Sequence, residues 1–225
     1  MLVNITGTDI IYKPMSKYYP INLNLKNKKC LVAGAGRVAE RKVTRLLECG
    51  AHVLVIGLTA TPGLKALAKK KKIILKKRHV DTRDLNGATL VILATGDRKI
   101  NSLISSYCRK KGILVNVVDS PARCNFILPS VISRGDLTIS ISTAGISPTL
   151  SKKIRQGLEK RFGGEYAAFL RIMKRMRLGV IKRIKNPELR KAFFERALKP
   201  DIFGLLKRNK TARARQMLES FLKNG

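Results

Sequence analysis

Short apolar runs recur along the first half of the chain, separated by longer amphipathic stretches. The runs are rich in β-branched residues and too short for typical helices, so each predicts a buried strand. They lie at 29–33, 52–57, 73–75, 90–95 and 113–118. The stretches with a helical period between them lie at about 37–49, 62–71 and 98–111. This alternation predicts an α/β domain with a doubly wound parallel sheet of the Rossmann type, covered by helices on both faces.

The pattern changes after residue 119. Residues 136–143 alternate apolar and small polar side chains, which predicts a half-covered strand. Ser147 is a suitable N-cap, and Pro148 suits the first turn of the helix that follows. From about residue 164 the pattern is helical and strongly basic. Breaks between these helices are expected at 186–187 and 199–201. The expected domains are a nucleotide-binding domain (1–128), a small α+β domain (129–162) and a basic helical domain (163–225).

The balance of charge is strongly basic. The chain has 47 Lys and Arg residues against 14 Asp and Glu residues, a formal net charge of +33. Such a field favours a polyanionic partner, which can be a nucleic acid, an anionic lipid or a substrate rich in carboxylates. Aromatic residues make up 5% of the chain and do not alternate with the basic ones, so no platform for stacking single-stranded bases is indicated. The sequence disfavours nucleic acid as a partner without ruling it out.

Neither a membrane span nor a metal site is indicated. No apolar run has the length of a membrane span, and the N-terminus lacks the layout of a signal peptide, so we expect a cytoplasmic protein. The four cysteines are scattered without a C-x-x-C pair, which favours reduced thiols over a zinc site. Cys124 is interpreted as a structural thiol rather than a redox or metal-binding group.

A glycine-rich turn follows the first apolar run. Gly34-x-Gly36-x-x-Ala39 stands between that run and a helical pattern, the context of a dinucleotide-binding loop. Gly34 permits the tight turn, Gly36 lets the backbone approach a pyrophosphate, and Ala39 keeps the helix close to the sheet. The N–H groups at the helix start favour phosphate. A dinucleotide site is predicted, with a plain strand-to-helix turn as the alternative.

Four motifs along residues 18–162 together resemble a known family. They are Gly34-x-Gly36-x-Val38-Ala39-x-Arg41-Lys42, Val115-Asn116-Val117-Val118-Asp119-x-Pro121, Phe126-x-x-Pro129-x-Val131-x-x-Arg134-Gly135-x-Leu137 and Ile141-Ser142-Thr143-x-Gly145-x-Ser147-Pro148. Their succession resembles the precorrin-2 dehydrogenase family, which includes the N-terminal module of bacterial sirohaem synthase. The last three motifs are more specific than the glycine turn.

The resemblance implies an activity and an assembly. Such enzymes oxidise precorrin-2 to sirohydrochlorin with NAD, and several also insert ferrous iron to give sirohaem; the sequence leaves this second reaction open. They are homodimers in which the small domain, here 129–162, interlocks with its partner's. A helical C-terminal segment completes the cleft for the substrate, a tetrapyrrole with eight carboxylates. The strongly basic composition fits such a ligand but exceeds what it requires.

Asp119 is the expected catalytic residue. It ends a predicted strand at the carboxyl edge of the sheet, where ligands bind in this kind of fold, and its carboxylate can accept a proton. It also matches the aspartate to which the family assigns this role. The alternative is an ordinary turn residue at a strand end.

The cofactor and substrate residues are expected at loops around that edge. No acidic residue follows the second strand to bind a ribose hydroxyl, and Arg37 can accept a 2′-phosphate, so the residues leave NADP open. The resemblance implies NAD. Gly34, Gly36 and Thr95 are expected cofactor contacts from their positions, with an ordinary strand end as the alternative for Thr95. The resemblance implies four more contacts: Arg37, Val38, Leu58 and Thr59. The expected substrate contacts are Asn116, Ser142, Thr143, Gly145 and Ser147, of which the last four precede a helix in a loop suited to a carboxylate.

The competing interpretation is a binding module. In it, the nucleotide-binding domain acts as a sensor, and the basic helical tail contacts nucleic acid or a protein partner. The density of Lys and Arg over 171–215 favours this view. The motifs over 116–119 and 142–148 favour the enzyme, because a sensor would not require them.

Overall fold

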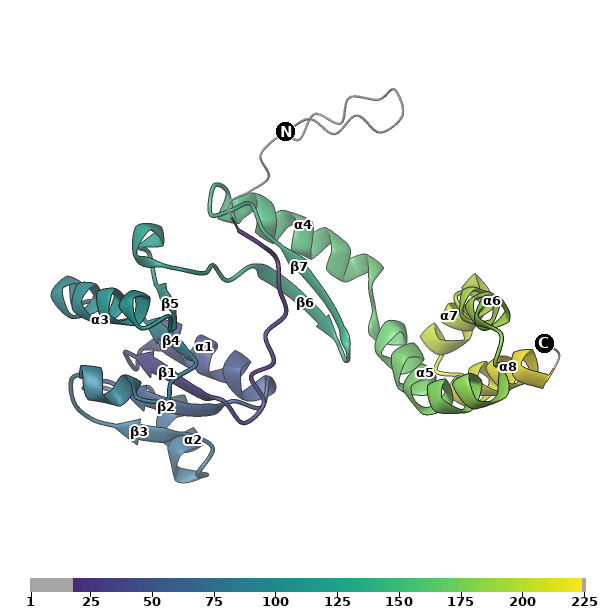
Figure 1. Cartoon of the computed structure of the whole chain (residues 1–225), viewed down its shortest axis with the longest axis horizontal. Helices are drawn as coiled ribbons and strands as arrows, with labels where there is room; N and C mark the ends of the chain where they lie inside the picture. The colour runs from purple at the N-terminus through teal and green to yellow at the C-terminus, as the bar shows by residue number, and fades with distance from the viewer. Residues whose placement is uncertain (1–17, 224–225) are drawn as a thin grey trace, which may run out of the picture. The chain divides into compact units, whose positions relative to one another are not determined.

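The computed structural model describes residues 18–223; the remainder of the first and third expected domains, residues 1–17 and 224–225, lies outside it. The chain forms two compact units, which divide between Leu128 and Pro129. Figure 1 shows a sheet flanked by helices in the first unit, and a hairpin followed by helices in the second.

The first unit is built on a five-stranded parallel sheet with the order β3-β2-β1-β4-β5. The strands are β1 (Lys29–Ala33), β2 (His52–Ile56), β3 (Ile74–Lys76), β4 (Leu90–Leu93) and β5 (Leu114–Val117). Each lies at the apolar run that predicted it. The chain order reverses between β1 and β4, so the carboxyl ends of these two strands form the topological switch point at which ligands bind in open α/β sheets. The expected Rossmann-type fold is confirmed.

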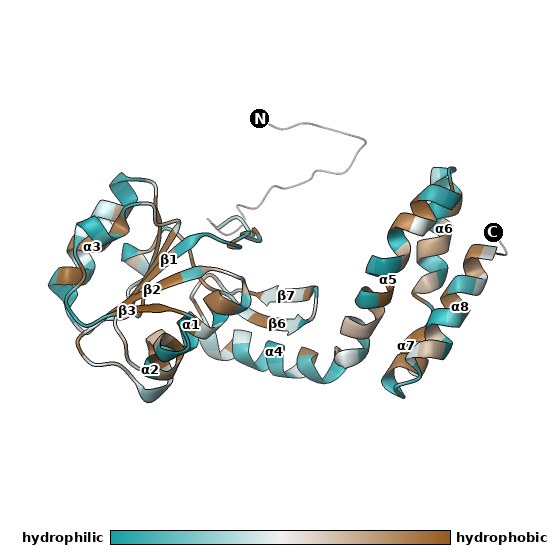
Figure 2. Ribbon diagram, turned by 90° about the horizontal axis from the view of Figure 1, so that it is seen from below, coloured by the Kyte–Doolittle hydropathy of each residue, from teal (hydrophilic) through white to brown (hydrophobic). Residues whose placement is uncertain are grey.

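Helices cover both faces of this sheet. They are α1 (Arg37–Glu48), α2 (Pro62–Lys69) and α3 (Arg98–Lys110), with short 3₁₀ turns η1 (Thr82–Leu85) and η2 (Pro121–Arg123). Neighbouring strand residues alternate between the faces, as the pleat requires. Val32 packs with Val43 of α1 and Leu64 of α2 in one core, and Leu31 packs with Ile104 of α3 in the other. Figure 2 shows these strands as strongly hydrophobic.

The second unit begins with an antiparallel hairpin of β6 (Ser130–Arg134) and β7 (Leu137–Ile141), followed by α4 (Pro148–Arg161). Ser147 caps α4 as expected, because its hydroxyl accepts the N–H of Leu150 at 3.3 Å. Among the described residues of β6, β7 and α4, Ile132 is the only buried apolar side chain. A two-stranded sheet with so small a core is marginal by itself.

Four further helices form a separate bundle within the second unit. They are α5 (Gly164–Arg183), α6 (Pro187–Ala197), α7 (Pro200–Lys207) and α8 (Thr211–Lys223). The expected breaks are confirmed, since α6 and α7 each begin at a proline. Its core has ten buried residues: Phe169, Ile172, Met176, Val180, Phe193, Ala197, Ile202, Leu206, Ala214 and Leu218.

Candidate functional site

The glycine turn joins the ends of three strands. Gly34 has φ +100°, a left-handed conformation that glycine adopts without strain. Its N–H donates to the carbonyl of Ile56 at the end of β2, at 2.7 Å. A Cβ at Gly34 would collide with the carbonyl of Ala94, just after β4. The turn therefore requires glycine, and it lies directly at the switch point.

Gly36, in contrast to Gly34, lies beside open space. A Cβ at this position would have no atom within 4 Å, so the space beside its backbone is open. Gly36 is the N-cap of α1, and no side chain caps that helix. In contrast, the hydroxyl of Thr61 caps α2 and the carboxylate of Asp97 caps α3. The first N–H groups of α1 are thus left for a ligand, and their partial positive charge suits a phosphate group.

The loop after β2 packs against this turn. A Cβ at Gly57 would lie 2.9 Å from the backbone nitrogen of Ala35, and the N–H of Thr61 donates to the carbonyl of Ala35 at 3.1 Å. Leu58 and Thr59 lie between these two anchors, and both are exposed. The loop therefore carries the two expected contacts to the carboxyl edge beside the glycine turn, where an adenosine would lie in such folds.

The first turn of α1 holds two further expected contacts. Arg37 is exposed and Val38 is half-buried. A surface hollow on the same helix is lined by Arg37, Glu40, Arg41 and Thr44. The helix also carries Lys42, whose pKa is lowered by burial and then by the neighbouring charge of Arg41. The structure leaves the guanidinium of Arg37 accessible at the helix start.

Thr95 is held by a hydrogen-bonded network after β4. Its hydroxyl donates to Oδ1 of Asn101 at 2.7 Å, and Nδ2 of Asn101 donates to the carbonyl of Thr95 at 3.0 Å. The N–H of Asp97 donates to the Thr95 hydroxyl at 3.3 Å. Because the hydroxyl proton is already used, Thr95 shapes this loop, and its contact with a cofactor stays a prediction.

Asp119 stands on a tight turn after β5. The N–H of Ser120 donates to the carbonyl of Val117 at 3.2 Å, and Asp119 has φ +57°. Aspartate is one of the few residues other than glycine that occupy this region readily. Its side chain is exposed, and within the described part of the chain it forms no hydrogen bond or ion pair. The carboxylate is therefore free to face a ligand at the carboxyl edge of the sheet.

Asn116 on β5 binds the segment that returns along the edge of the sheet. Its Nδ2 donates to the carbonyl of Phe126 at 3.2 Å. Cys124 lies in the same returning segment, where its sulfur accepts the N–H of Val117 at 3.1 Å. Asn125 completes the arrangement, because its Oδ1 accepts the N–H of Val115 at 2.7 Å. These contacts fasten the segment along the outer edge of β5 and support the structural interpretation of Cys124.

Two of the remaining cysteines, Cys30 and Cys108, are buried. Burial raises the pKa of Cys30 to about 11, with a further contribution from Cys49, and burial raises the pKa of Cys108 to about 11. All four thiols are free. Within residues 18–223, no three His, Cys, Asp or Glu side chains come together as a metal ion would require.

The hydroxyl-rich loop of the second unit is largely satisfied internally. Thr143 Oγ1 accepts the N–H of Ser147 at 3.1 Å and lies 3.0 Å from the carbonyl of Ser147 and 3.1 Å from the hydroxyl of Ser151. The hydroxyl of Ser142 accepts the N–H of Ala144 at 3.0 Å and is exposed. Gly145 has φ +86° and open space beside it. Ser142 and Gly145 are thus the accessible members of the loop.

Three positioning residues were not identified from the sequence. Asn101 orders the loop after β4, and Asn125 pairs with β5. Arg134 donates from Nε to the carbonyl of Phe162 at 2.8 Å, which satisfies the end of α4. A sequence signal existed for two of them. Asn101 shares an apolar helix face with Ile104 and Cys108 at the spacing of buried residues, and Arg134 stands in the third motif of the family resemblance.

The parallel sheet, its switch point and the uncapped start of α1 define a dinucleotide-binding protein of the Rossmann type. Three family models match successive parts of the chain. An NAD(P)-binding model matches residues 21–130, the sirohaem biosynthesis protein central model matches residues 134–161, and the sirohaem synthase dimerisation region matches residues 165–222.

Individual relatives agree with these models. The siroheme synthase of Thioalkalivibrio sulfidiphilus is 36% identical over 208 residues, and that of Methylococcus capsulatus is 37% identical over 181 residues. The alignments cover 92% and 80% of this chain, but 42% and 38% of the relatives. The solved structure of SirC, a precorrin-2 dehydrogenase, superposes with a TM-score of 0.73 at 26% identity, covering 90% of this chain and all of SirC. Together the three models cover most of residues 21–222, and over this range the chain is similar to the precorrin-2 dehydrogenase SirC and to the corresponding part of siroheme synthases.

The match places the dimerisation region in a different segment from the one expected. The family model described as the sirohaem synthase dimerisation region matches residues 165–222, which form the helical bundle. We expected the dimer contacts over residues 129–162 instead. The location of the dimer contacts therefore stays a prediction. None of the helices within residues 18–223 is both long and apolar enough to cross a membrane.

Proposed function

We propose that the protein oxidises precorrin-2 to sirohydrochlorin with NAD, in the biosynthesis of sirohaem. The single observation that carries the proposal is the pairing of an uncapped, glycine-lined helix start with a free carboxylate, Asp119, at the same edge of one parallel sheet. The similarity to siroheme synthases and to the precorrin-2 dehydrogenase SirC supports this choice of substrate.

The residues at the switch point fit a dinucleotide. The open space at Gly36 and the first N–H groups of α1 would hold the pyrophosphate, and Leu58 and Thr59 would flank the adenosine. The loop of Thr95, ordered by Asn101, would border the nicotinamide half. NAD supplies the hydride acceptor when bound.

Asp119 would take the proton that accompanies hydride removal from the tetrapyrrole. A general base needs an accessible, unpaired acceptor within reach of the substrate. Its carboxylate meets the first requirement, since it is exposed and forms no ion pair among the described residues. The backbone turn at Val117–Ser120 fixes the position of Asp119 just after β5. Asn116 would act on the substrate side indirectly, by fixing the segment that follows.

The loop over 142–147 would bind a carboxylate of the substrate. Ser142 keeps its hydroxyl proton available while its oxygen accepts from Ala144, and Gly145 leaves its backbone open. Thr143 and Ser147 would hold the loop in shape, because their hydroxyls already bond within it. The acidic side chains of a polycarboxylate tetrapyrrole would suit the basic composition of the protein.

We further propose a homodimer. The hairpin of β6 and β7 with α4 buries Ile132 alone among its apolar side chains, and Leu150 and Ile154 of α4 are 49% and 40% exposed. A second copy would supply the missing packing for this small sheet. The four free cysteines agree with a reducing compartment, so we place the enzyme in the cytoplasm.

Insertion of ferrous iron into the product is a second candidate reaction. The observation that favours it is again the free carboxylate of Asp119, which can remove protons from the macrocycle nitrogens as the metal enters. Iron would be a substrate here, held mainly by the macrocycle.

The test is a spectroscopic assay. Purified protein is incubated with precorrin-2, with NAD or NADP, and the absorbance of sirohydrochlorin is followed; ferrous iron is then added. We expect oxidation that requires NAD and that is lost in Asp119→Asn. Folded protein that binds NAD but does not turn over precorrin-2 would contradict the proposal.

A further inference from the structure

The solvent face of α5 carries a row of cations without an acidic residue. Arg171, Lys174, Arg175 and Lys182 are all exposed and recur at helical spacing, with the exposed Leu178 between them. The opposite face is buried in the bundle through Phe169, Ile172, Met176 and Val180. We call Arg171, Lys174, Arg175 and Lys182 the α5 basic face.

These cations have few partners. Lys174 approaches Asp136 at 3.5 Å, and both side chains are largely exposed. Within residues 18–223, the other three members of the α5 basic face form no ion pair. Nor do Arg171, Lys174 and Arg175 lie in the last turn of α5, where cations stabilise a helix end.

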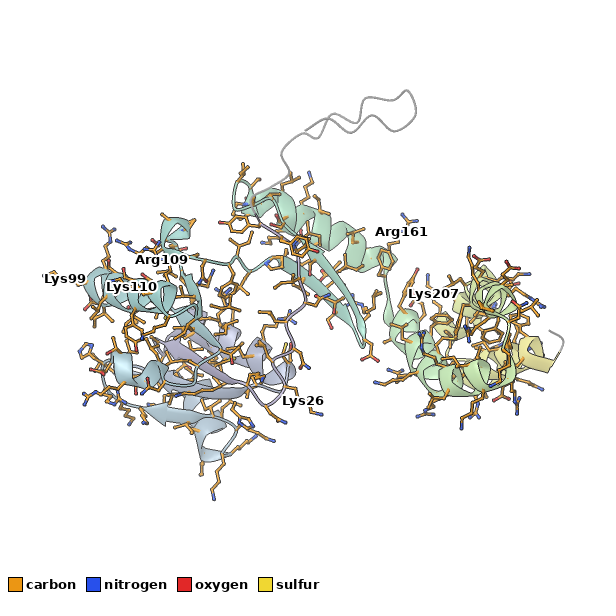
Figure 3. The ribbon with its side chains drawn as sticks, viewed as in Figure 1. Lys26, Lys99, Arg109, Lys110, Arg161 and Lys207 are labelled. Atoms are coloured by element: carbon orange, nitrogen blue, oxygen red, sulfur yellow. The ribbon has the colours of Figure 1, made fainter. Side chains whose placement is uncertain are left out.

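Some of the basic residues elsewhere have a local explanation. On α3, Arg109 and Lys110 occupy the last turn, and Figure 3 shows them together at that end of the helix. In the bundle, Arg196 lies over the ring of Phe221 at 4.7 Å, and Lys191 pairs with Glu195. The α5 basic face is thus a concentration of charge that the packing of the protein does not use.

We propose that the α5 basic face binds the phosphate backbone of double-stranded nucleic acid without reading its sequence. From Arg171 to Lys182 the face extends roughly 16 Å along the helix axis, enough to meet several phosphates of a duplex. Because the α5 basic face carries only positive charges, the same face of a second copy would be repelled from it. The inference is independent of the proposed reaction, since it uses none of the residues assigned to it.

The absence of aromatic side chains from the α5 basic face favours double-stranded over single-stranded nucleic acid. The α5 basic face contains no aromatic residue, whereas binding to single strands relies on bases stacked against aromatic rings. Backbone contacts alone release counterions, so the affinity should fall steeply with salt.

The experiment measures binding of the full chain to a fluorescent DNA duplex of arbitrary sequence over a range of salt concentrations. The variant Arg171→Gln/Lys174→Gln/Arg175→Gln should reduce the slope of log K against log salt by about 3, at roughly 0.9 for each phosphate contact. The matched control is Lys65→Gln/Lys70→Gln/Lys72→Gln, which removes the same charge from exposed positions of the first unit and should leave most of the slope intact.

Further arms distinguish the other partners. Arg171→Lys/Arg175→Lys should retain duplex binding, and so should Leu178→Gln, which would weaken a protein interface centred on that side chain. Anionic phospholipid vesicles and polyglutamate are tested at the same salt concentrations and should bind more weakly than the duplex. Equal losses in both triple variants, or stronger binding of vesicles or polyglutamate, would overturn the proposal.

Discussion

Gly34 turns directly against the carbonyl of Ala94, so tightly that no Cβ fits between them. The contact joins the end of β1 to the end of β4, across the point where the chain order of the sheet reverses. The most specific backbone feature of the protein thus lies where its cofactor is proposed to bind.

Two glycine substitutions should separate folding from binding. Gly34→Ala should destabilise the protein by about 1–3 kcal/mol, because of both the collision and the left-handed backbone. Gly36→Ala should leave the thermal midpoint nearly unchanged but reduce the affinity for NAD about tenfold, because its Cβ enters the space left for pyrophosphate. Thermal unfolding and NAD titration measure the two effects. Undiminished NAD affinity in Gly36→Ala would contradict the cofactor site.

Asp119 can be tested without disturbing the turn. Asn tolerates the left-handed region about as well as Asp, so Asp119→Asn should retain the stability of the protein while precorrin-2 oxidation falls by about 100-fold or more. Asp119→Ala should in addition cost about 1 kcal/mol of folding free energy. Single-turnover rates and thermal midpoints are compared for both variants. An active Asp119→Asn enzyme would remove this residue from the mechanism.

The first unit should lose stability in acid through one ion pair. Arg78 donates to both carboxylate oxygens of Asp84, at 2.7 and 2.6 Å, and Asp84 is 7% exposed. Mainly because of these hydrogen bonds, the pKa of Asp84 falls from 3.8 to about 2. A lowered pKa stabilises the folded state fully above pH 4, and this contribution is lost as pH falls through about 2.

Replacement of the acid should remove that part of the pH dependence. Asp84→Asn should lower the free energy of unfolding at pH 7 by about 2 kcal/mol and flatten its decline between pH 4 and 2. Asp81→Asn is the comparison variant. Hydrogen bonds from Arg83 also lower the pKa of Asp81, but the Asp81 side chain is 45% exposed, so its effect on stability should be smaller, and an asparagine can still cap η1. Urea unfolding across this pH range measures both. An unchanged acid decline in Asp84→Asn would assign it to other groups.

Arg134 should stabilise the end of α4. Its guanidinium donates to the carbonyl of Phe162 and reaches that of Glu159 at 3.4 Å, two groups that the helix itself leaves unpaired. Arg134→Ala should therefore destabilise the second unit by about 1–2 kcal/mol. Arg134→Lys should recover part of this, because an ammonium group cannot serve both carbonyls with the same geometry. Hydrogen exchange of α4 amides reports the change; equal protection in Arg134→Ala would contradict it.

The fold of the first unit was predictable, because its strands are buried on both faces and read as continuous apolar runs. In the second unit, β7 was recognised by its alternation, but β6 was not, since Ser, Arg and a preceding proline interrupt its apolar pattern. The glycine turn was predicted from its context, and Asp119 was predicted from its position at a strand end together with the family resemblance. What the sequence could not show is how the hydroxyls of Thr143 and Ser147 are used, because their partners depend on the path of the loop.

The fastening of Cys124 and Asn125 along β5 has a consequence for the whole architecture. An outermost strand normally leaves a row of unsatisfied amides that can recruit foreign chains into amyloid-like growth. Here the Cys124 thiol and the Asn125 carboxamide accept the edge N–H groups of Val117 and Val115, as a sixth strand would. The five-stranded sheet therefore ends at β5. Just downstream, between Leu128 and Pro129, the chain leaves this unit and begins the second one, so the protection of the sheet edge is complete within the first unit.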